Sequence, residues 1–153
     1  MGNRTLSYHD REILLVEDNP DDEALTRRAF ARNKIKNPII SVSDGAAALD
    51  YLFGEGAYVD RKDAPLPHVV LLDMNLPKIP GIEVLRRIRS DARTWYLPVV
   101  ILTSSRERHD LIDSHRSGVN FYVRKPVDFE EFVRTAGQLG FYWLHLNETI
   151  ESP

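Results

Sequence analysis

Short apolar runs alternate with amphipathic segments along this 153-residue chain. The clearest runs, Ile13 to Val16 and Val69 to Leu72, are apolar throughout, as is typical of parallel strands covered on both faces. Strands are predicted over residues 12–17, 38–42, 69–73, 97–103 and 120–124. Helices are predicted from Pro20, over 45–53, 81–90 and 106–117, and from about 128 to 147. This alternation favours an α/β fold, a doubly wound five-stranded parallel sheet with five helices.

The expected strand order is 2-1-3-4-5, that of the flavodoxin-like class, in which ligands bind beyond the carboxyl ends of the strands. At this length and with 42% hydrophobic residues, one core is the default. We therefore expect a single domain over residues 11–148, a flexible N-terminal segment over 1–10 and a tail over 149–153.

Three carboxylates and one lysine follow predicted strands. Glu17 and Asp18 come directly after the first apolar run, Asp73 ends the third, and Lys125 follows the fifth. Like charges repel and resist desolvation, so such a cluster requires a counter-charge. Clustered carboxylates with no cysteine in the chain favour a hard cation, and Mg²⁺ suits two or three such oxygens.

The same residues could support phosphoryl transfer. Asp73 lies on the central strand and is the best nucleophile, and its attack on phosphorus would give an acyl phosphate. Lys125 offers positive charge and Thr103 a hydroxyl to the phosphoryl group. Simpler interpretations exist for each residue alone: Thr103 could cap a helix, and Lys125-Pro126 could form only a turn.

Four motifs together resemble the receiver domain of two-component response regulators, the CheY-like family, over about residues 12–147. They are Ile-Leu-Leu-Val-Glu-Asp-Asn at 13–19, Leu-Leu-Asp-Met-Asn-Leu-Pro at 71–77 with Gly81, Leu-Thr-Ser at 102–104, and Val-Arg-Lys-Pro at 123–126. One departure concerns the turn before the third helix, where Pro80 stands at a position at which an acid or Asn is common in this family.

The resemblance implies roles for these residues. Asp73 would accept a phosphoryl group from a histidine kinase, and Thr103 and Lys125 would grip that group. The implied Mg²⁺ ligands are Asp18, Asp73 and the backbone carbonyl of Asn75, with Glu17 acting mainly through water. Tyr122 and Thr103 would form the switch. The protein would then be a phosphoacceptor that catalyses its own phosphotransfer and slow dephosphorylation, not a separate enzyme.

Residues 52–58 and the terminal segment 132–146 resemble a subgroup of stand-alone receivers, often partnered with phytochrome-type or other sensor kinases. No output domain is expected after the last helix, so output is expected through phosphorylation-dependent protein binding or through onward phosphate transfer. Phe141 to Leu144 are four consecutive apolar residues that cannot all face one side of a helix. They indicate either a homodimer interface, involving the fourth helix, fifth strand and fifth helix, or aromatics tucked under the N-terminal segment.

Residues 54–67 form a longer connection than usual, interpreted either as a solvated surface excursion or as a partner-specific loop. The net charge of −3 predicts no nucleic-acid partner, and the absence of cysteine and of long apolar runs predicts a cytoplasmic protein without membrane association.

Three alternatives compete. A flavin carrier is disfavoured because the acidic loop after the first strand repels phosphate. An aspartate phosphatase would need an acid where Asn75 stands. A degenerate receiver that only binds a partner is the remaining alternative.

Overall fold

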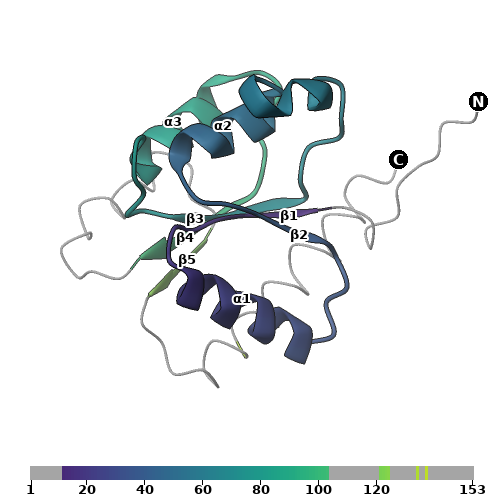
Figure 1. The fold of residues 1–153 in the computed structure, drawn as a ribbon, viewed down its shortest axis with the longest axis vertical. Helices are drawn as coiled ribbons and strands as arrows, with labels where there is room; N and C mark the ends of the chain where they lie inside the picture. The colour runs from purple at the N-terminus through teal and green to yellow at the C-terminus, as the bar shows by residue number, and fades with distance from the viewer. Residues whose placement is uncertain (1–11, 104–120, 125–133, 135–136, 138–153) are drawn as a thin grey trace, which may run out of the picture.

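A computed structural model describes residues 12–103, 121–124, 134 and 137. Within this part of the chain, five strands form one parallel sheet in the order β2-β1-β3-β4-β5 (Figure 1). The strands are β1 (Ile13–Val16), β2 (Ile39–Val42), β3 (Val69–Asp73), β4 (Val99–Thr103) and β5 (Phe121–Arg124). The fold class and the strand order predicted from the sequence are confirmed.

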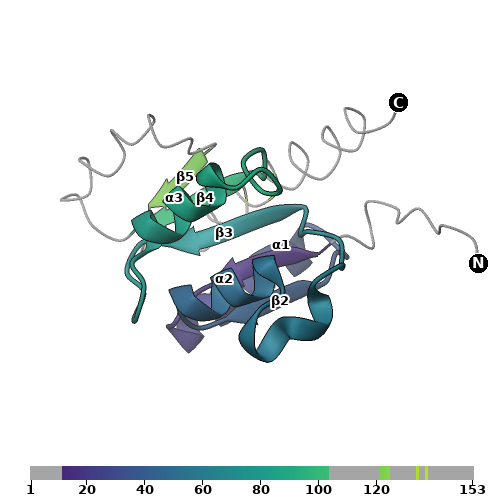
Figure 2. The same cartoon turned by 90° about the horizontal axis from the view of Figure 1, so that it is seen from above.

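Helices cover both faces of the sheet. Helix α1 (Pro20–Arg32) lies on one face, and α2 (Gly45–Phe53) and α3 (Gly81–Ser90) lie on the other (Figures 1 and 2). Each face has its own apolar cluster, with Leu14, Leu72 and Leu85 in one and Leu15, Phe30 and Leu71 in the other. Successive residues within β1, and within β3, thus pack into the cores on opposite faces of the sheet. Both faces of these strands are buried, which explains why the strands are apolar throughout.

Several predicted segments lie outside the described residues. They are the helix over 106–117, most of the helix over 128–147, the N-terminal segment 1–10 and the tail 149–153. Within the last predicted helix, Arg134 and Gly137 are helical. Among the helices that the structure describes, none combines the length and the apolarity needed to cross a bilayer.

Strand boundaries differ from the predicted ones by one or two residues, mainly at prolines. β2 begins at Ile39 because Pro38 has no backbone N–H to donate to a neighbouring strand. Pro38 contributes only its carbonyl, which accepts a hydrogen bond from the Ile13 N–H at 2.8 Å. β4 begins at Val99 because the Leu97 N–H donates to the carbonyl of Thr94 in a turn. The register aligns the carboxyl ends: Val16 pairs with Leu72.

Helix α1 begins as the sequence predicts. The Asn19 side chain accepts hydrogen bonds from the backbone N–H groups of Asp21 and Asp22, and Pro20 is the first helical residue. On its inward face Thr26, Ala29 and Phe30 are buried, whereas Leu25 is only half-buried. Thr26 tolerates this position because its hydroxyl donates to the carbonyl of Asp22 at 3.0 Å.

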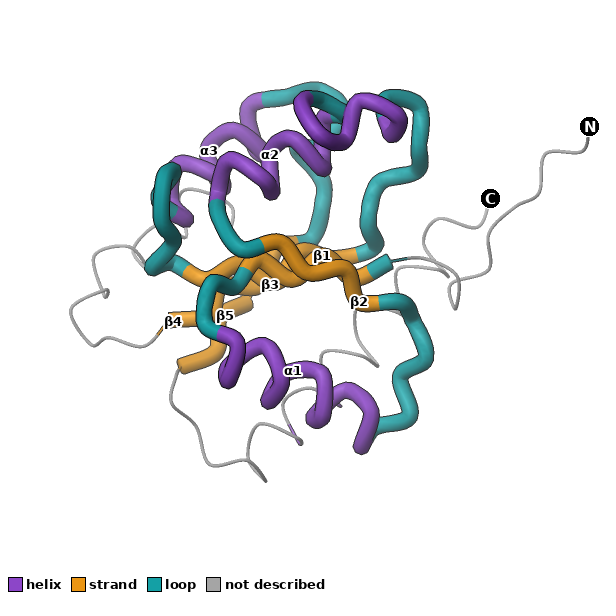
Figure 3. Tube along the Cα trace, viewed as in Figure 1, coloured by secondary structure: helices purple, strands orange, loops and turns teal. Residues whose placement is uncertain are grey.

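The connection over 54–67 includes a short helical segment. It contains a 3₁₀ helix, η2 (Gly56–Arg61), beside the C-terminal end of α2 (Figure 3). Tyr58 packs against the core cluster beneath α2 and meets the Tyr51 ring edge-on at 5.1 Å between centroids. The Arg61 guanidinium lies 3.7 Å from the centroid of the Tyr51 ring. Gly56, Ala57, Val59 and Asp60 are nevertheless exposed, so this half of the segment lies on the surface, as the first interpretation expects. The partner-specific role stays a prediction.

Candidate phosphoacceptor and metal site

Three acids meet at the carboxyl edge of the sheet. Asp73 is the last residue of β3, and Glu17 and Asp18 directly follow β1, which pairs with β3. One carboxylate oxygen from each of the three lies within 4.8 Å of those of the other two. Glu17 and Asp73 are 3% and 4% exposed, whereas Asp18 faces solvent. The sheet thus brings together residues that are 55 positions apart in the chain.

Backbone N–H groups orient two of these carboxylates. The N–H of Asn75 donates to Asp73 Oδ1 at 2.9 Å, and the N–H of Asn19 donates to Glu17 Oε2 at 3.3 Å. Both bonds span two residues, the Asx-type pattern in which a side chain bonds the backbone two positions on. The family resemblance implies a role only for the carbonyl of Asn75, not for its N–H. The sequence signal for both bonds is an Asn two positions after an acid, at Glu17/Asn19 and Asp73/Asn75.

The turn after Asp73 needs a glycine at its end. A Cβ on Gly81 would lie 2.5 Å from the carbonyl oxygen of Asp73 and 2.8 Å from Cα of Met74. Helix α3 therefore begins in direct backbone contact with the end of β3. Pro80 caps it without a side-chain bond, and its carbonyl accepts from the N–H of Glu83 at 3.0 Å. The departure at Pro80 is thus compatible with an ordinary helix start.

The same loop contacts the start of α2. The Ile79 N–H donates to the carbonyl of Pro77 at 2.9 Å, with Lys78 between them at φ 67°, a strained three-residue turn. Lys78 Nζ lies 3.4 Å from Asp44 Oδ2. A Cβ on Gly45 would lie only 2.2 Å from the carbonyl oxygen of Ile79. The Lys78–Asp44 ion pair cannot be predicted from the sequence, because nothing local links positions 44 and 78.

Asp44 also caps α2. The capping hydrogen bond and the ion pair with Lys78 both stabilise the charged form of its carboxyl. Its Oδ1 accepts from the Ala47 N–H at 2.7 Å. That backbone hydrogen bond, with a smaller contribution from Lys78, lowers the pKa of the Asp44 carboxyl below its ordinary value. Asp44 is therefore held ionised next to the loop that follows Asp73.

The remaining predicted site residues are placed only in part. Thr103 ends β4 and pairs in register with Arg124, and Tyr122 of β5 pairs with Ile101. This register puts Thr103 one strand away from Asp73, whose partner on β4 is Leu102. The side chains of Thr103 and Tyr122, and the whole of Lys125, lie outside the described residues.

The three carboxylates fit a divalent ion. All offer oxygen donors, which hard cations prefer, and their separation lets one ion contact more than one of them. Two of the acids are buried and one is exposed, so an ion could enter from solvent while its charge offsets theirs.

Residues 13–136 match the family described as response regulator receiver domain. The chain belongs to this family. A relative from Methanothrix harundinacea, the probable methanogenesis regulatory protein FilR2, is 43% identical over 138 residues, which are 90% of this chain and 86% of the relative.

Solved receiver structures resemble the chain over most of its length. The bacteriophytochrome response regulator RtBRR is 48% identical, with a TM-score of 0.76 over 88% of this chain and 80% of its own. The phosphorylated cyanobacterial phytochrome response regulator RcpA is 35% identical, with a TM-score of 0.78 over 90% of this chain and 96% of its own. The Mn²⁺-bound form of response regulator Rcp1 is 34% identical, with a TM-score of 0.76 over 88% and 95%.

Membership in this family makes the chain a phosphoacceptor signalling protein of two-component type. Its three clustered carboxylates are a candidate site for a divalent metal. The flavin-carrier and phosphatase alternatives are thereby set aside.

Proposed function

We propose that Asp73 of this response regulator accepts a phosphoryl group from a histidine kinase, with Mg²⁺ at the carboxylates of Glu17, Asp18 and Asp73. The observation that carries the proposal is the convergence of these three acids within 4.8 Å at the edge between β1 and β3. Asp73 is the member of the cluster on the central strand, and the Asn75 N–H fixes one of its oxygens at 2.9 Å. The other oxygen, Oδ2, is then the attacking atom.

In the transfer step, Asp73 Oδ2 forms a bond to phosphorus while the phosphorus–nitrogen bond of phosphohistidine breaks. The leaving imidazole nitrogen keeps the electron pair of that bond and takes up a proton. The product is an acyl phosphate on Asp73, and water later attacks its phosphorus to regenerate the carboxylate. A bound Mg²⁺ supplies positive charge that offsets the acids and the phosphoryl oxygens.

Other residues of the proposed site complete the chemistry. The backbone carbonyl of Asn75 is the further protein ligand to the metal, and Glu17 acts mainly through water. Thr103 and Lys125 hold the phosphoryl oxygens, and Thr103 with Tyr122 forms the switch that reports phosphorylation. The strand register supports Thr103, because its position at the end of β4 neighbours the end of β3.

Mg²⁺ is proposed over softer metals because the donors are carboxylate and carbonyl oxygens. The Mn²⁺-bound form of Rcp1 supports a divalent ion in a similar receiver. The proposed kinase is of phytochrome type, since two of the similar structures are phytochrome response regulators. The likeness to FilR2 makes another class of sensor kinase the second candidate.

The proposed output is phosphorylation-dependent protein binding by a cytoplasmic receiver domain over residues 11–148. The proposed homodimer uses the region of the fourth helix, β5 and the fifth helix. Sedimentation of the protein with and without a phosphoryl mimic tests the dimer: a change in assembly supports it, and identical assembly contradicts it.

Labelling with acetyl phosphate tests the phosphoacceptor. The wild type should gain one phosphoryl group in the presence of Mg²⁺, and Asp73→Asn should gain none. Retained stoichiometric label in Asp73→Asn would refute the assignment of the nucleophile. Absence of label in the wild type would favour the alternative of a degenerate receiver that acts only by binding a partner.

A further inference from the structure

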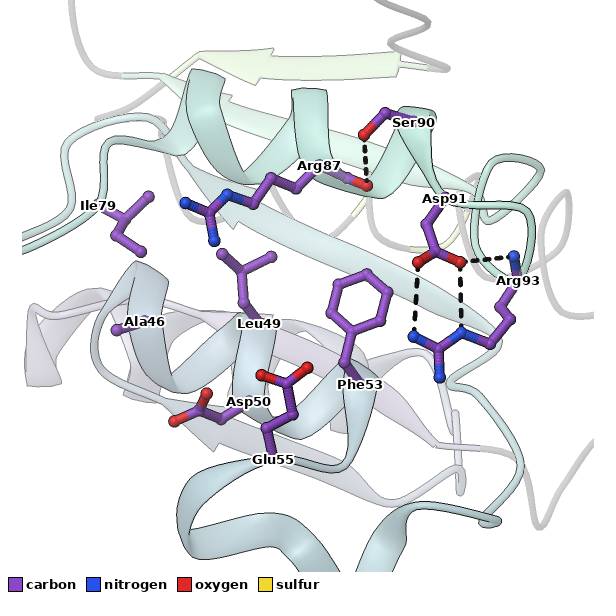
Figure 4. A pocket seen from close by; sticks show the side chains of 10 residues that line it. All are labelled: Ala46, Leu49, Asp50, Phe53, Glu55, Ile79, Arg87, Ser90, Asp91 and Arg93. Atoms are coloured by element: carbon purple, nitrogen blue, oxygen red, sulfur yellow. Dashed lines mark hydrogen bonds and ion pairs between the residues drawn. The ribbon is translucent and has the colours of Figure 1, made fainter.

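Helices α2 and α3 lie on the sheet face opposite α1 (Figure 1). A groove of about 340 Å³ lies between them, and Figure 4 shows its lining. Its lining includes three large apolar side chains, Leu49 and Phe53 of α2 and Ile79 of the loop before α3, among polar and charged ones. Leu49 is buried, whereas Phe53 and Ile79 are half-buried and so leave apolar surface facing the groove. A groove between two helices is a geometry that receives a third helix.

Two carboxylates stand together at the C-terminal end of α2. Gly54 ends the helix at φ 65°, and the Glu55 N–H donates to the carbonyl of Asp50 at 2.9 Å, which brings Glu55 beside Asp50 at the groove. Gly56 packs closely against Asp50, since a Cβ there would lie 2.6 Å from Asp50 Oδ2. The 3₁₀ segment that begins at Gly56 therefore lies directly beside the Asp50 carboxylate.

This placement of charge is unfavourable for the free protein. The C-terminal end of a helix carries partial negative charge, which favours cations there, yet the last turn of α2 has no basic residue. Neither Asp50 nor Glu55 forms an ion pair within the part of the chain that the structure describes. Three sources of negative potential thus add at one end of the groove, and no ion pair among the described residues offsets Asp50 or Glu55.

The arginines that line the groove are already engaged. Arg93 contacts Asp91 through Nε at 3.3 Å, and its guanidinium lies 4.9 Å from the centroid of the Phe53 ring (Figure 4). Arg87 shares the carboxylate of Glu83 with Arg86, at 3.7 and 3.5 Å. These pairs leave the acidic end at Asp50 and Glu55 as the part of the groove that attracts a cation.

We propose that the α2–α3 groove docks a basic amphipathic helix of a partner protein. Large apolar side chains of that helix would pack on Leu49, Phe53 and Ile79, and a lysine or arginine would pair with Asp50 and Glu55. Because α2 and α3 run beside one another with Leu49, Phe53 and Ile79 between them, a helix buries more of this surface than a single side chain can. This role goes beyond phosphoryl acceptance and does not require a phosphoryl group on Asp73.

Two designed helical peptides test the proposal. Both carry the same leucine stripe, one with flanking arginines and the other with flanking glutamates. Each is titrated into the isotope-labelled full chain carrying Asp73→Asn, and binding is followed by NMR shifts of α2 and α3. Using the unphosphorylatable variant separates failure of this proposal from failure of the phosphoacceptor assignment.

The arginine peptide should bind about tenfold more tightly than the glutamate peptide, as expected for two exposed charge pairs changed from attraction to repulsion. Asp50→Lys/Glu55→Lys should reverse that preference without lowering the melting temperature. Asp60→Lys/Asp63→Lys is the matched control, because both aspartates are exposed, neither lines the groove, and the change in net charge is the same. This control should keep the wild-type preference.

Three outcomes would overturn the proposal. The first is equal affinity of the wild type for the two peptides, and the second is no binding of either. The third is an equal change of preference in the groove variant and in the control variant, because net charge alone would then account for the result.

Discussion

Single residues of this protein fix the backbone around the acidic site. Asn19 both caps α1 and donates its N–H to Glu17, and Asn75 donates its N–H to Asp73. Gly81 allows α3 to begin against the carbonyl of Asp73, and Asp44 joins the start of α2 to Lys78 in the loop after Asp73. Each of these contacts sets the position of a carboxylate or of the loop beside it.

Substitution of Asp44 separates its cap from its ion pair. Asp44→Ala should destabilise the protein by about 1 kcal/mol, because the Ala47 N–H loses its acceptor. Asp44→Asn should cost much less, since Asn also caps helices and the Lys78 side chain is 68% exposed. Urea unfolding of the two variants measures the difference. Equal losses of unfolding free energy in the two variants would contradict the view that the capping hydrogen bond contributes more than the ion pair with Lys78.

The lowered pKa of Asp44 gives a pH dependence of defined sign. Because its folded pKa lies below the ordinary value of 3.8, the carboxylate contributes stability that is complete above that value and is lost as the pH falls below it. The stability of the wild type relative to Asp44→Asn should therefore be constant near neutral pH and decline from about pH 5 toward pH 2. Urea unfolding at a series of pH values tests this, and a difference that grows on acidification would be the wrong sign.

Gly81→Ala should disturb both stability and phosphorylation. The added methyl group would meet backbone atoms of Asp73 and Met74, which cannot rotate away. We expect a loss of about 2 kcal/mol in unfolding free energy and slower labelling of Asp73 by acetyl phosphate. Arg86→Ala, on the exposed side of the same helix, should change stability by no more than about 0.5 kcal/mol. A fully active and stable Gly81→Ala protein would contradict the backbone contact.

At the scale of elements, one polar and aromatic cluster holds η2 against α2 and against Glu12, the residue before β1. The Tyr51 hydroxyl donates to Glu12 Oε1, and Arg61 Nη2 lies 3.6 Å from the same oxygen. Arg61 also covers the Tyr51 ring, which Tyr58 meets edge-on. Burial, together with the bond to Glu12, raises the pKa of the Tyr51 hydroxyl, so it stays a hydrogen-bond donor at neutral pH.

Tyr51→Phe should loosen η2 more than the rest of the domain. Loss of the hydrogen bond to a charged acceptor is expected to cost about 1.5–3 kcal/mol at most, with the ring still packed under Arg61. Amide hydrogen exchange should accelerate first over Gly56–Arg61. Tyr96→Phe, at an exposed ring, is the matched control and should leave exchange unchanged. Uniform acceleration across the sheet would argue against a local role for the cluster.

For the whole molecule, the sheet converts distant sequence positions into one charged edge. In the absence of a cation, repulsion among Glu17, Asp18 and Asp73 opposes the packing of β1 against β3. Metal binding and folding are therefore coupled, because the unfolded chain does not hold the three acids together.

Mg²⁺ should raise the thermal stability of the protein, and a chelator should remove the gain. At a concentration one hundred times the dissociation constant, the gain is about 2.7 kcal/mol. Asp18→Asn should reduce the Mg²⁺-dependent shift of the melting temperature, whereas Asp60→Asn, an exposed acid on η2, should not. An undiminished shift in Asp18→Asn would contradict the proposed ligand set.

Much of the fold and of the acidic site could be predicted from patterns of neighbouring residues in the sequence. Apolar runs identified the strands, Asn19-Pro20 identified the start of α1, and acids directly after Val16 and Leu72 identified the edge where a cation would bind. These signals are readable in sequence because strand burial, helix capping and like-charge repulsion act between neighbours in the chain or follow from the general topology of parallel sheets.

Only the tertiary structure decided the contacts between elements that are distant in the chain. The approach of Ile79 to Gly45, the pairing of Lys78 with Asp44, and the packing of η2 on Tyr51 depend on how loops and helices pack together. So does the acidic end of the α2–α3 groove, where the turn at Gly54 brings Glu55 to Asp50 and α3 closes the other side. No pattern of residues predicts such contacts, because they are selected by the shape of the assembled core.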